Sequence, residues 1–210
     1  MPILQVRFFG TIEISFAGEK LPLPATRKAQ SLLAYLILNR GKSQPRNRLV
    51  ELFWGDRPEE KARGSLSTAL WHISHCLPEK KYILSDVTSV QFNPDLDLCL
   101  DSEQFIDLIS HNDIIGLQSA LALYKGDFMD GFYDDWIIQE RYRLESLYLD
   151  GLARLMSAFE MKMEYNAALE TALRLLTLDS LREDAHRVAM RVYCQVGQRN
   201  AALEQYQRCR

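Results

Sequence analysis

The segment from residue 62 to residue 77 gathers hydrogen-bonding and aromatic side chains on one side of an expected helix. At 100° per residue, six apolar residues form the stripe of a core-facing helix: Ala62, Leu66, Ala69, Leu70, Ile73 and Leu77. The opposite side and its flanks hold Gly64, Ser67, Thr68, Trp71, His72 and His75. Hydroxyl and imidazole groups are donors and acceptors that can read base edges in the major groove of DNA. The pattern predicts a recognition helix, and an ordinary solvated face is the alternative interpretation.

Phosphate contacts would come from other residues, which position a duplex without reading its sequence. The candidates are Arg46, Arg48, Arg63, Thr88 and Ser89. For Arg46 and Arg48 a role as solvated surface charge is an equally good interpretation. For Arg27 and Lys28, at the start of an earlier helix, surface charge is the better interpretation.

Other chemistries find little support. His72, His75 and Cys76 suggest a metal site, but Cys76 turns toward the core and no fourth ligand lies nearby in the sequence. Asp134 and Asp135 stand at the start of an expected helix, where the helix dipole favours acidic residues. No glycine-rich phosphate loop, serine nucleophile elbow or HExxH motif occurs. We therefore expect no enzyme activity, no metal and no cofactor.

The elements around the recognition helix follow a known order. Alternating apolar residues predict strands over 3–10 and 11–16, and helical spacing follows over 27–39, over 45–54 and after Pro58. Two β-prone runs, 82–85 and 89–92, predict a hairpin. A small sheet, three helices and a hairpin are typical of a winged helix-turn-helix. Residues 93–95 break the pattern, so we place this domain at 1–95.

Beyond residue 100 every pattern is helical. We expect helices near 102–111, 113–124, 134–162, 164–178, 182–196 and 199–210. The sequence Asn-Ala-Ala-Leu-Glu occurs at 166–170 and again at 200–204, a spacing of 34 residues that is typical of tetratricopeptide (TPR) units. The alanines should allow close helix packing, with Leu169 and Leu203 filling the seam. The fold class is therefore mainly α with small β, namely a winged helix followed by an all-α, TPR-like domain at 100–210.

Charge separates the two parts. Residues 1–100 carry 13 Lys and Arg against 10 Asp and Glu, a net charge of +3, whereas residues 101–210 carry 12 against 18, a net charge of −6. A polyanion would thus be attracted by the first part and repelled by the second. No apolar run is long enough to span a bilayer, and the N-terminus lacks a signal-peptide pattern, so we expect a cytoplasmic protein without a membrane partner. The four scattered cysteines are expected to be reduced.

Motifs in both parts resemble the SARP family of bacterial regulators, in which an OmpR-type winged helix precedes a bacterial transcriptional activation domain. The matching stretches, in order, are Phe8–Ile14, Leu33–Leu38, Arg48–Gly55, Ala62-Arg63, Leu123–Phe128, Asp135-Trp136 and Glu140. Two departures stand out: the outer face of the third helix holds Trp71, His72, Ser74 and His75 where the family usually has arginines, and the family's second domain usually runs further than Arg210.

The resemblance implies a sequence-specific transcriptional regulator, an activator by its second domain. Its partners would be double-stranded promoter DNA, a second copy of the chain on direct repeats, and RNA polymerase. The arginine-poor third helix favours a different hypothesis, a protein-interaction scaffold whose winged helix has lost DNA binding.

Overall fold

A computed structural model describes residues 3–111 and 113–209, and their contacts divide into two compact units. The first unit comprises Met1–Leu100 together with Met129–Ile137, and the second comprises Asp101–Phe128 together with Ile138–Arg210. The chain therefore enters the second unit, returns to the first for nine residues and leaves it again. Nothing in the sequence pattern indicated that 129–137 belongs with the N-terminal part.

The first unit begins with a four-stranded sheet. β1 (Leu4–Arg7) pairs antiparallel with β2 (Glu13–Phe16), and β2 pairs with the short β3 (Glu19–Lys20). On its other side β1 pairs in parallel with β7 (Leu98–Leu100). The first two strands confirm the alternation in the sequence, whereas β7 lies where we expected the chain to leave regular structure.

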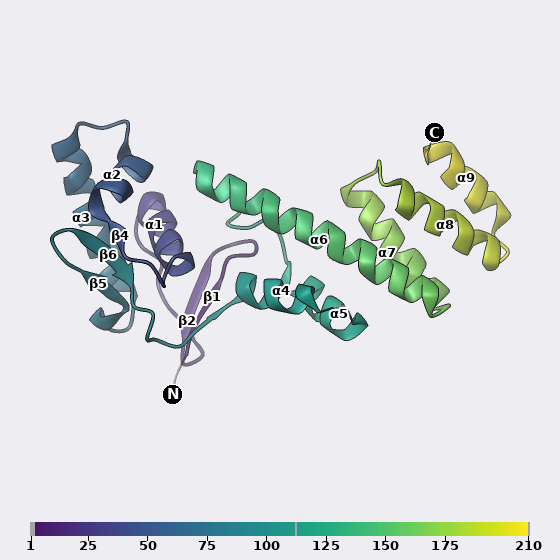
Figure 1. Cartoon of the computed structure of the whole chain (residues 1–210), viewed down its shortest axis with the longest axis horizontal. Helices are drawn as coiled ribbons and strands as arrows, with labels where there is room; N and C mark the ends of the chain where they lie inside the picture. Colours follow the sequence, from purple (N-terminus) through teal and green to yellow (C-terminus); the bar gives the residue numbers. More distant parts are fainter. Residues whose placement is uncertain (1–2, 112, 210) are drawn as a thin grey trace. The chain divides into compact units, whose positions relative to one another are not determined.

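Three helices and a hairpin complete this unit (Figure 1). The helices are α1 (Arg27–Leu38), α2 (Arg46–Trp54) and α3 (Glu59–Cys76), and α3 packs on both α1 and α2. A short 3-10 helix, η1 (Lys80–Tyr82), leads into β5 (Ile83–Ser85) and β6 (Ser89–Phe92), which pair as a hairpin. β4 (Gln44–Pro45) adds a third strand to β6. This order confirms the predicted winged helix-turn-helix, with the hairpin as its wing.

The amphipathic pattern of α3 is confirmed almost residue by residue. Ala62, Leu66, Ala69, Ile73 and Leu77 are buried, while Leu70 is only half-buried. Burial of this stripe removes apolar surface from water and fixes the rotation of the helix about its axis. The polar and aromatic side chains opposite the stripe must therefore face solvent.

The segment Met129–Ile137, which we call the strap, is held in the first unit by hydrogen bonds and packing. The amide of Met129 donates to the Phe8 carbonyl oxygen at 2.7 Å, and Met129 itself is fully buried. The Asp134 carboxylate accepts from the Lys28 ammonium at 2.6 Å and from the Ser31 hydroxyl at 2.9 Å. The Trp136 ring meets the Tyr35 ring edge-on, with 5.5 Å between centroids.

The elements of the second unit in the described residues are all helices. α4 (Asp101–Ser110) packs against α5 (Ile114–Leu123), and α6 (Asp135–Met161) continues into this unit from the strap. α7 (Tyr165–Leu178), α8 (Glu183–Gln195) and α9 (Arg199–Cys209) follow as neighbouring helices (Figure 1). All six predicted helices are present, with ends within about two residues of the expected positions.

Small residues set the helix contacts of this unit. A Cβ on Gly151, in the middle of α6, would lie 2.5 Å from Cδ1 of Ile109, so a larger residue there would require the Ile109 side chain to shift. Ala168 and Ala202, the alanines of the repeated motif, are buried as expected. Leu203 is 62% exposed, so the expectation that it fills a seam was wrong. No helix in the described residues is long and apolar enough to cross a membrane.

Candidate nucleic-acid interface

The exposed face of α3 carries a cluster of three aromatic rings: Trp71, His72 and His75. The Trp71 ring centroid lies 4.1 Å from that of His75 and 5.1 Å from that of His72. Nδ1 of His75 lies 2.8 Å from the Trp71 carbonyl oxygen, so Nδ1 carries the proton and donates it, which leaves Nε2 available to another group. Trp71 is 57% exposed, an unusual position for so large an apolar surface without a partner.

The two predicted hydroxyl residues of α3 are exposed beside this cluster. Ser67 donates to the Arg63 carbonyl oxygen at 3.1 Å and Thr68 to the Gly64 carbonyl oxygen at 3.0 Å. Such bonds to the preceding turn keep the hydroxyls close to the helix surface. Their oxygens can still accept a hydrogen bond, for example from a base amino group.

The predicted arginines have different surroundings. Arg46 is half-buried and donates to the Asp86 carbonyl oxygen and to the Ser85 hydroxyl, each at 2.8 Å. It therefore braces the wing against the start of α2. Arg63 pairs with Glu59 one turn earlier at 2.7 Å, and both side chains are largely exposed. Arg48 is exposed and has no hydrogen-bond or ion-pair partner in the described residues.

The turn of the wing is held by the Asp86 carboxylate, which was not among the residues predicted from the sequence. Asp86 accepts hydrogen bonds from the backbone amide and hydroxyl of Thr88 and from those of Ser89, at 2.6–3.1 Å. These bonds, chiefly those from Thr88, lower the pKa of Asp86 to about 2, because they stabilise the charged form. The Thr88 and Ser89 hydroxyls thus already donate to Asp86, which gives them a role in shaping the turn. An Asp one residue before a turn with such donors is a sequence signal that could have revealed this.

Two hollows flank α3. The first has a volume of about 620 Å³ and lies between α2, α3 and the wing, where it brings together Arg46, Arg63 and Ser67 with the Asp86 carboxylate. The second has a volume of about 600 Å³ and lies between α1, the end of α2 and α3. It contains Arg57 and Lys61, two cations that we did not predict to be functional. For Lys61 a sequence signal was available, since residues 61, 65, 68 and 72 follow one stripe of a helix and all line this hollow.

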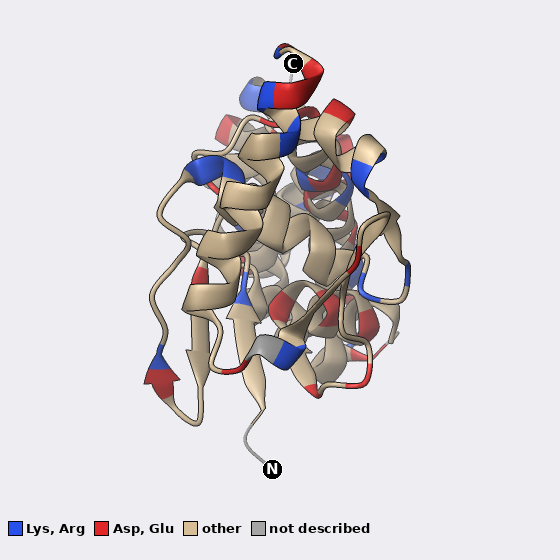
Figure 2. Cartoon of the chain, turned by 90° about the vertical axis from the view of Figure 1, so that its left-hand side faces the viewer, with Lys and Arg blue, Asp and Glu red and all other residues tan. Residues whose placement is uncertain are grey.

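Positive charge is not continuous over this unit. Figure 2 shows Lys and Arg at separate places on the near helices and loops, with no helix that is basic along its length. The outward face of α3 itself presents no Lys or Arg between residues 64 and 76. Base contacts there would have to use hydroxyl, indole and imidazole groups.

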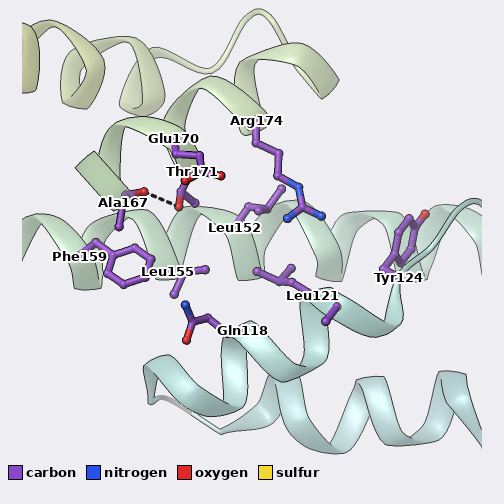
Figure 3. Close-up of a pocket in the computed structure, with 11 residues that line it drawn as sticks. Gln118, Leu121, Tyr124, Leu152, Leu155, Phe159, Ala167, Glu170, Thr171 and Arg174 are labelled. Carbon is purple, nitrogen blue, oxygen red and sulfur yellow. Dashed lines mark hydrogen bonds between the residues drawn. The ribbon is translucent and has the colours of Figure 1, made fainter. Parts of the chain in front are cut away.

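The second unit has a groove of its own (Figure 3). It has a volume of about 330 Å³ and lies between α5, α6 and α7, over the buried side chains of Leu121, Leu152, Leu155 and Phe159. Arg174 lies at one end, donates to the Tyr148 hydroxyl and stacks over that ring, 5.4 Å from its centroid. α5 contains no charged residue, yet Ile115 is exposed, so this helix offers apolar surface to a partner.

The acidic residues near the start of α6 have structural partners. Asp134 binds Lys28 and Ser31, and Glu140 pairs with Arg143 at 2.6 Å. Within the described residues no group of three or more His, Cys, Asp and Glu side chains could hold a metal ion.

Residues 111–210 match the bacterial transcriptional activator domain. Two curated relatives, the transcriptional regulatory protein MoaR1 of Mycobacterium bovis and that of Mycobacterium tuberculosis, are each 30% identical over 76 residues, or 36% of this chain. Mycobacterium tuberculosis EmbR, solved in complex with a low affinity phosphopeptide, matches the whole chain with a TM-score of 0.81 at 17% identity. These matches support the resemblance to the SARP-type regulators.

The family resemblance inferred from the motifs is thereby confirmed, and so is the architecture of a winged helix followed by a helical domain. The chain spans about a quarter of the length of the curated relatives it matches, 24%, and 59% of the EmbR chain. The likeness to EmbR establishes the fold, and the match to the activator domain establishes a family of transcriptional regulators.

Proposed function

We propose that this SARP-type regulator binds double-stranded promoter DNA with sequence preference, through α3 and the wing, and activates transcription. The observation that carries the proposal is the exposed face of α3, where Ser67, Thr68 and the aromatic cluster form a surface with little charge and many hydrogen-bonding groups. A recognition helix needs such a surface, since a major groove about 12 Å wide admits a helix and presents base donors, acceptors and thymine methyl groups to it.

Residues outside this face hold the duplex in place. Arg48 and Arg63 are exposed near α3 and supply charge to phosphates, and breaking the exposed Arg63–Glu59 pair costs little. Arg46 and Asp86 fix the wing, with Thr88 and Ser89 at its turn, so that the wing contacts the backbone next to α3.

The helical unit supplies protein contacts. Its net negative charge disfavours DNA, and the groove over Leu121 and Leu155 with α5 beside it suits an apolar segment of a partner. RNA polymerase and a second copy of this chain are the partners that we propose.

A fluorescence anisotropy titration of the full chain against a random-sequence duplex, at low and high salt, tests DNA binding. Affinity should fall steeply as salt rises, because neutralised phosphates release counterions. The Trp71→Ala variant should bind DNA more weakly than the wild type. Its melting temperature should stay close to that of the wild type, since Trp71 is exposed. Absence of any salt-sensitive binding by the wild-type chain would refute the proposal.

Two observations favour a second function, a protein-interaction scaffold without DNA binding: the lack of Lys and Arg on the outward face of α3, and the Asp86 carboxylate at the wing tip beside the 93% exposed side chain of Val87. A scaffold would show no salt-sensitive affinity for duplex. Its Trp71→Ala and Val87→Ser variants would instead lose a protein partner. The same titration therefore separates the two functions.

A further inference from the structure

The second hollow beside α3 is strongly cationic. Four residues with permanent positive charge line it: Arg27 and Lys28 from α1, Arg57 from the α2–α3 connection, and Lys61 from α3. The Ser65 and Thr68 hydroxyls lie on the same stripe of α3 as Lys61, and Trp54 and Ala69 form the apolar part of the lining. The described lining residues include no carboxylate. We call this site the cationic hollow.

The four cations differ in what already neutralises them. Lys28 is paired with Asp134 of the strap at 2.6 Å. Arg27 donates to the Gly131 carbonyl oxygen at 2.8 Å and lies over the Phe132 ring, 5.3 Å from its centroid, so it is oriented without being neutralised. Arg57 donates to the uncharged Ser65 hydroxyl at 3.2 Å. Among the described residues, Arg57 and Lys61 form no ion pair.

The other flank of α3 lacks this excess of charge. Arg63 there is paired with Glu59, and the Asp86 carboxylate is part of the lining beside Arg46. Several like charges around one concave surface raise the local potential and attract an anion, because solvent screens them less there than on a convex surface. Guanidinium and ammonium donors that converge from different elements suit a phosphate group, which accepts hydrogen bonds through several oxygens.

The cationic hollow lies directly beside the outward face of α3. Thr68 and His72 belong both to the outward face of α3 and to the lining of the cationic hollow. A helix in the major groove has a sugar-phosphate backbone on each side, at a distance set by the groove width. The N-terminus of α1, capped by Thr26, lies at the rim and adds the positive end of a helix dipole.

We propose that the cationic hollow binds a backbone phosphate of the duplex whose bases face α3, with Arg57 and Lys61 as the principal contacts. This inference rests on the proposed function, since it places the DNA along α3. It moves the main phosphate contact from Arg46 and the wing to the opposite flank of the helix.

The test compares two double variants of the full chain that remove the same charge. Arg57→Gln with Lys61→Gln changes the cationic hollow, and Arg7→Gln with Lys20→Gln changes two exposed cations of the N-terminal sheet. The affinity of each for a random-sequence 25-base-pair duplex is measured by anisotropy over a series of salt concentrations. The slope of log affinity against log salt reports the number of neutralised phosphates, at about 0.9 for each.

We expect the cationic-hollow variant to lower this slope by about 1–2 and to weaken binding about tenfold or more at low salt. The sheet variant should keep the wild-type slope. Arg57→Lys with Lys61→Arg should restore the slope, since it restores charge. All altered side chains are exposed, and melting curves followed by circular dichroism establish that each variant is folded.

Equal slopes for the cationic-hollow variant and the wild type would overturn the inference while leaving the proposed function intact. If the wild type binds no duplex at all, the proposed function itself fails, and the inference fails with it. Inorganic phosphate provides a separate arm. If phosphate raises the melting temperature of the wild type and not of the cationic-hollow variant, while their DNA slopes agree, the site takes a free phosphate and its assignment to DNA is wrong.

Discussion

Replacement of Asp134 by Ala should destabilise the first unit, although residue 134 lies well outside the N-terminal hundred residues. The Asp134 carboxylate accepts from the hydroxyl of Ser31, which is fully buried in α1, and from the Lys28 ammonium. Without Asp134 the Ser31 hydroxyl loses its acceptor in a place that water does not reach. Asp135→Ala is the matched control, since Asp135 is exposed.

The magnitude follows from the two bonds. Loss of the partner of a buried hydroxyl costs about 1–3 kcal/mol. The Lys28 side chain is 49% exposed, so its ion pair with Asp134 adds only about 0–1 kcal/mol. We expect the free energy of unfolding of the first unit to fall by about 1–4 kcal/mol in total, and by less than about 0.5 kcal/mol for the control.

Urea unfolding followed by tryptophan fluorescence measures this change in one unit. The three tryptophans, Trp54, Trp71 and Trp136, all belong to the first unit, so their emission does not report on the helical unit. A double-mutant cycle with Ser31→Ala isolates the hydroxyl–carboxylate coupling. Coincident unfolding midpoints for Asp134→Ala and Asp135→Ala would refute the reasoning that the strap is an integral part of this unit.

Two further predictions concern the helical unit and the wing. Ala168→Glu should unfold the helical unit, because it forces a charge into a fully buried helix contact; circular dichroism should show the loss while tryptophan emission persists. The folded-state pKa of Asp86 is depressed to about 2, so the wing turn should be intact above the ordinary carboxyl range and should loosen as pH falls toward 2. Faster amide exchange at Thr88 and Ser89 would report this loosening, and Asp86→Ala should show it already at neutral pH.

Much of the architecture could be predicted from the sequence because most elements are local. Apolar spacing predicts helices such as α3 and α7, and Pro58 marks the start of α3. β7 escaped prediction because a three-residue strand is defined by its distant partner, β1, and not by its own pattern. The strap escaped for the same reason, since its bonds to Phe8, Lys28 and Ser31 span about a hundred residues.

The sequence predicted which face of α3 is exposed, but it did not predict the partners of the charged groups around that face. The rotation of α3 follows from its buried stripe, so the exposure of Thr68, Trp71 and His75 could be deduced. The surroundings of each charge could not, because they depend on which elements pack together. Asp86 accepts hydrogen bonds from the hydroxyls of Thr88 and Ser89, and Arg57 and Arg27 line the same hollow only because α3 packs on α1.

The return of the chain to the first unit bears on how this protein can be cut and recombined. Cleavage or gene fusion after residue 100, the border that the strands and helices suggest, would divide the first unit, because the strap would stay with the piece that contains the second unit. The N-terminal piece would lack the groups that satisfy Phe8, Ser31 and Lys28, and the C-terminal piece would expose Met129 and Ile137, which are fully buried in the intact chain. Exchange of recognition modules between such regulators therefore has to carry two separated stretches of sequence at once, 3–100 and 129–137.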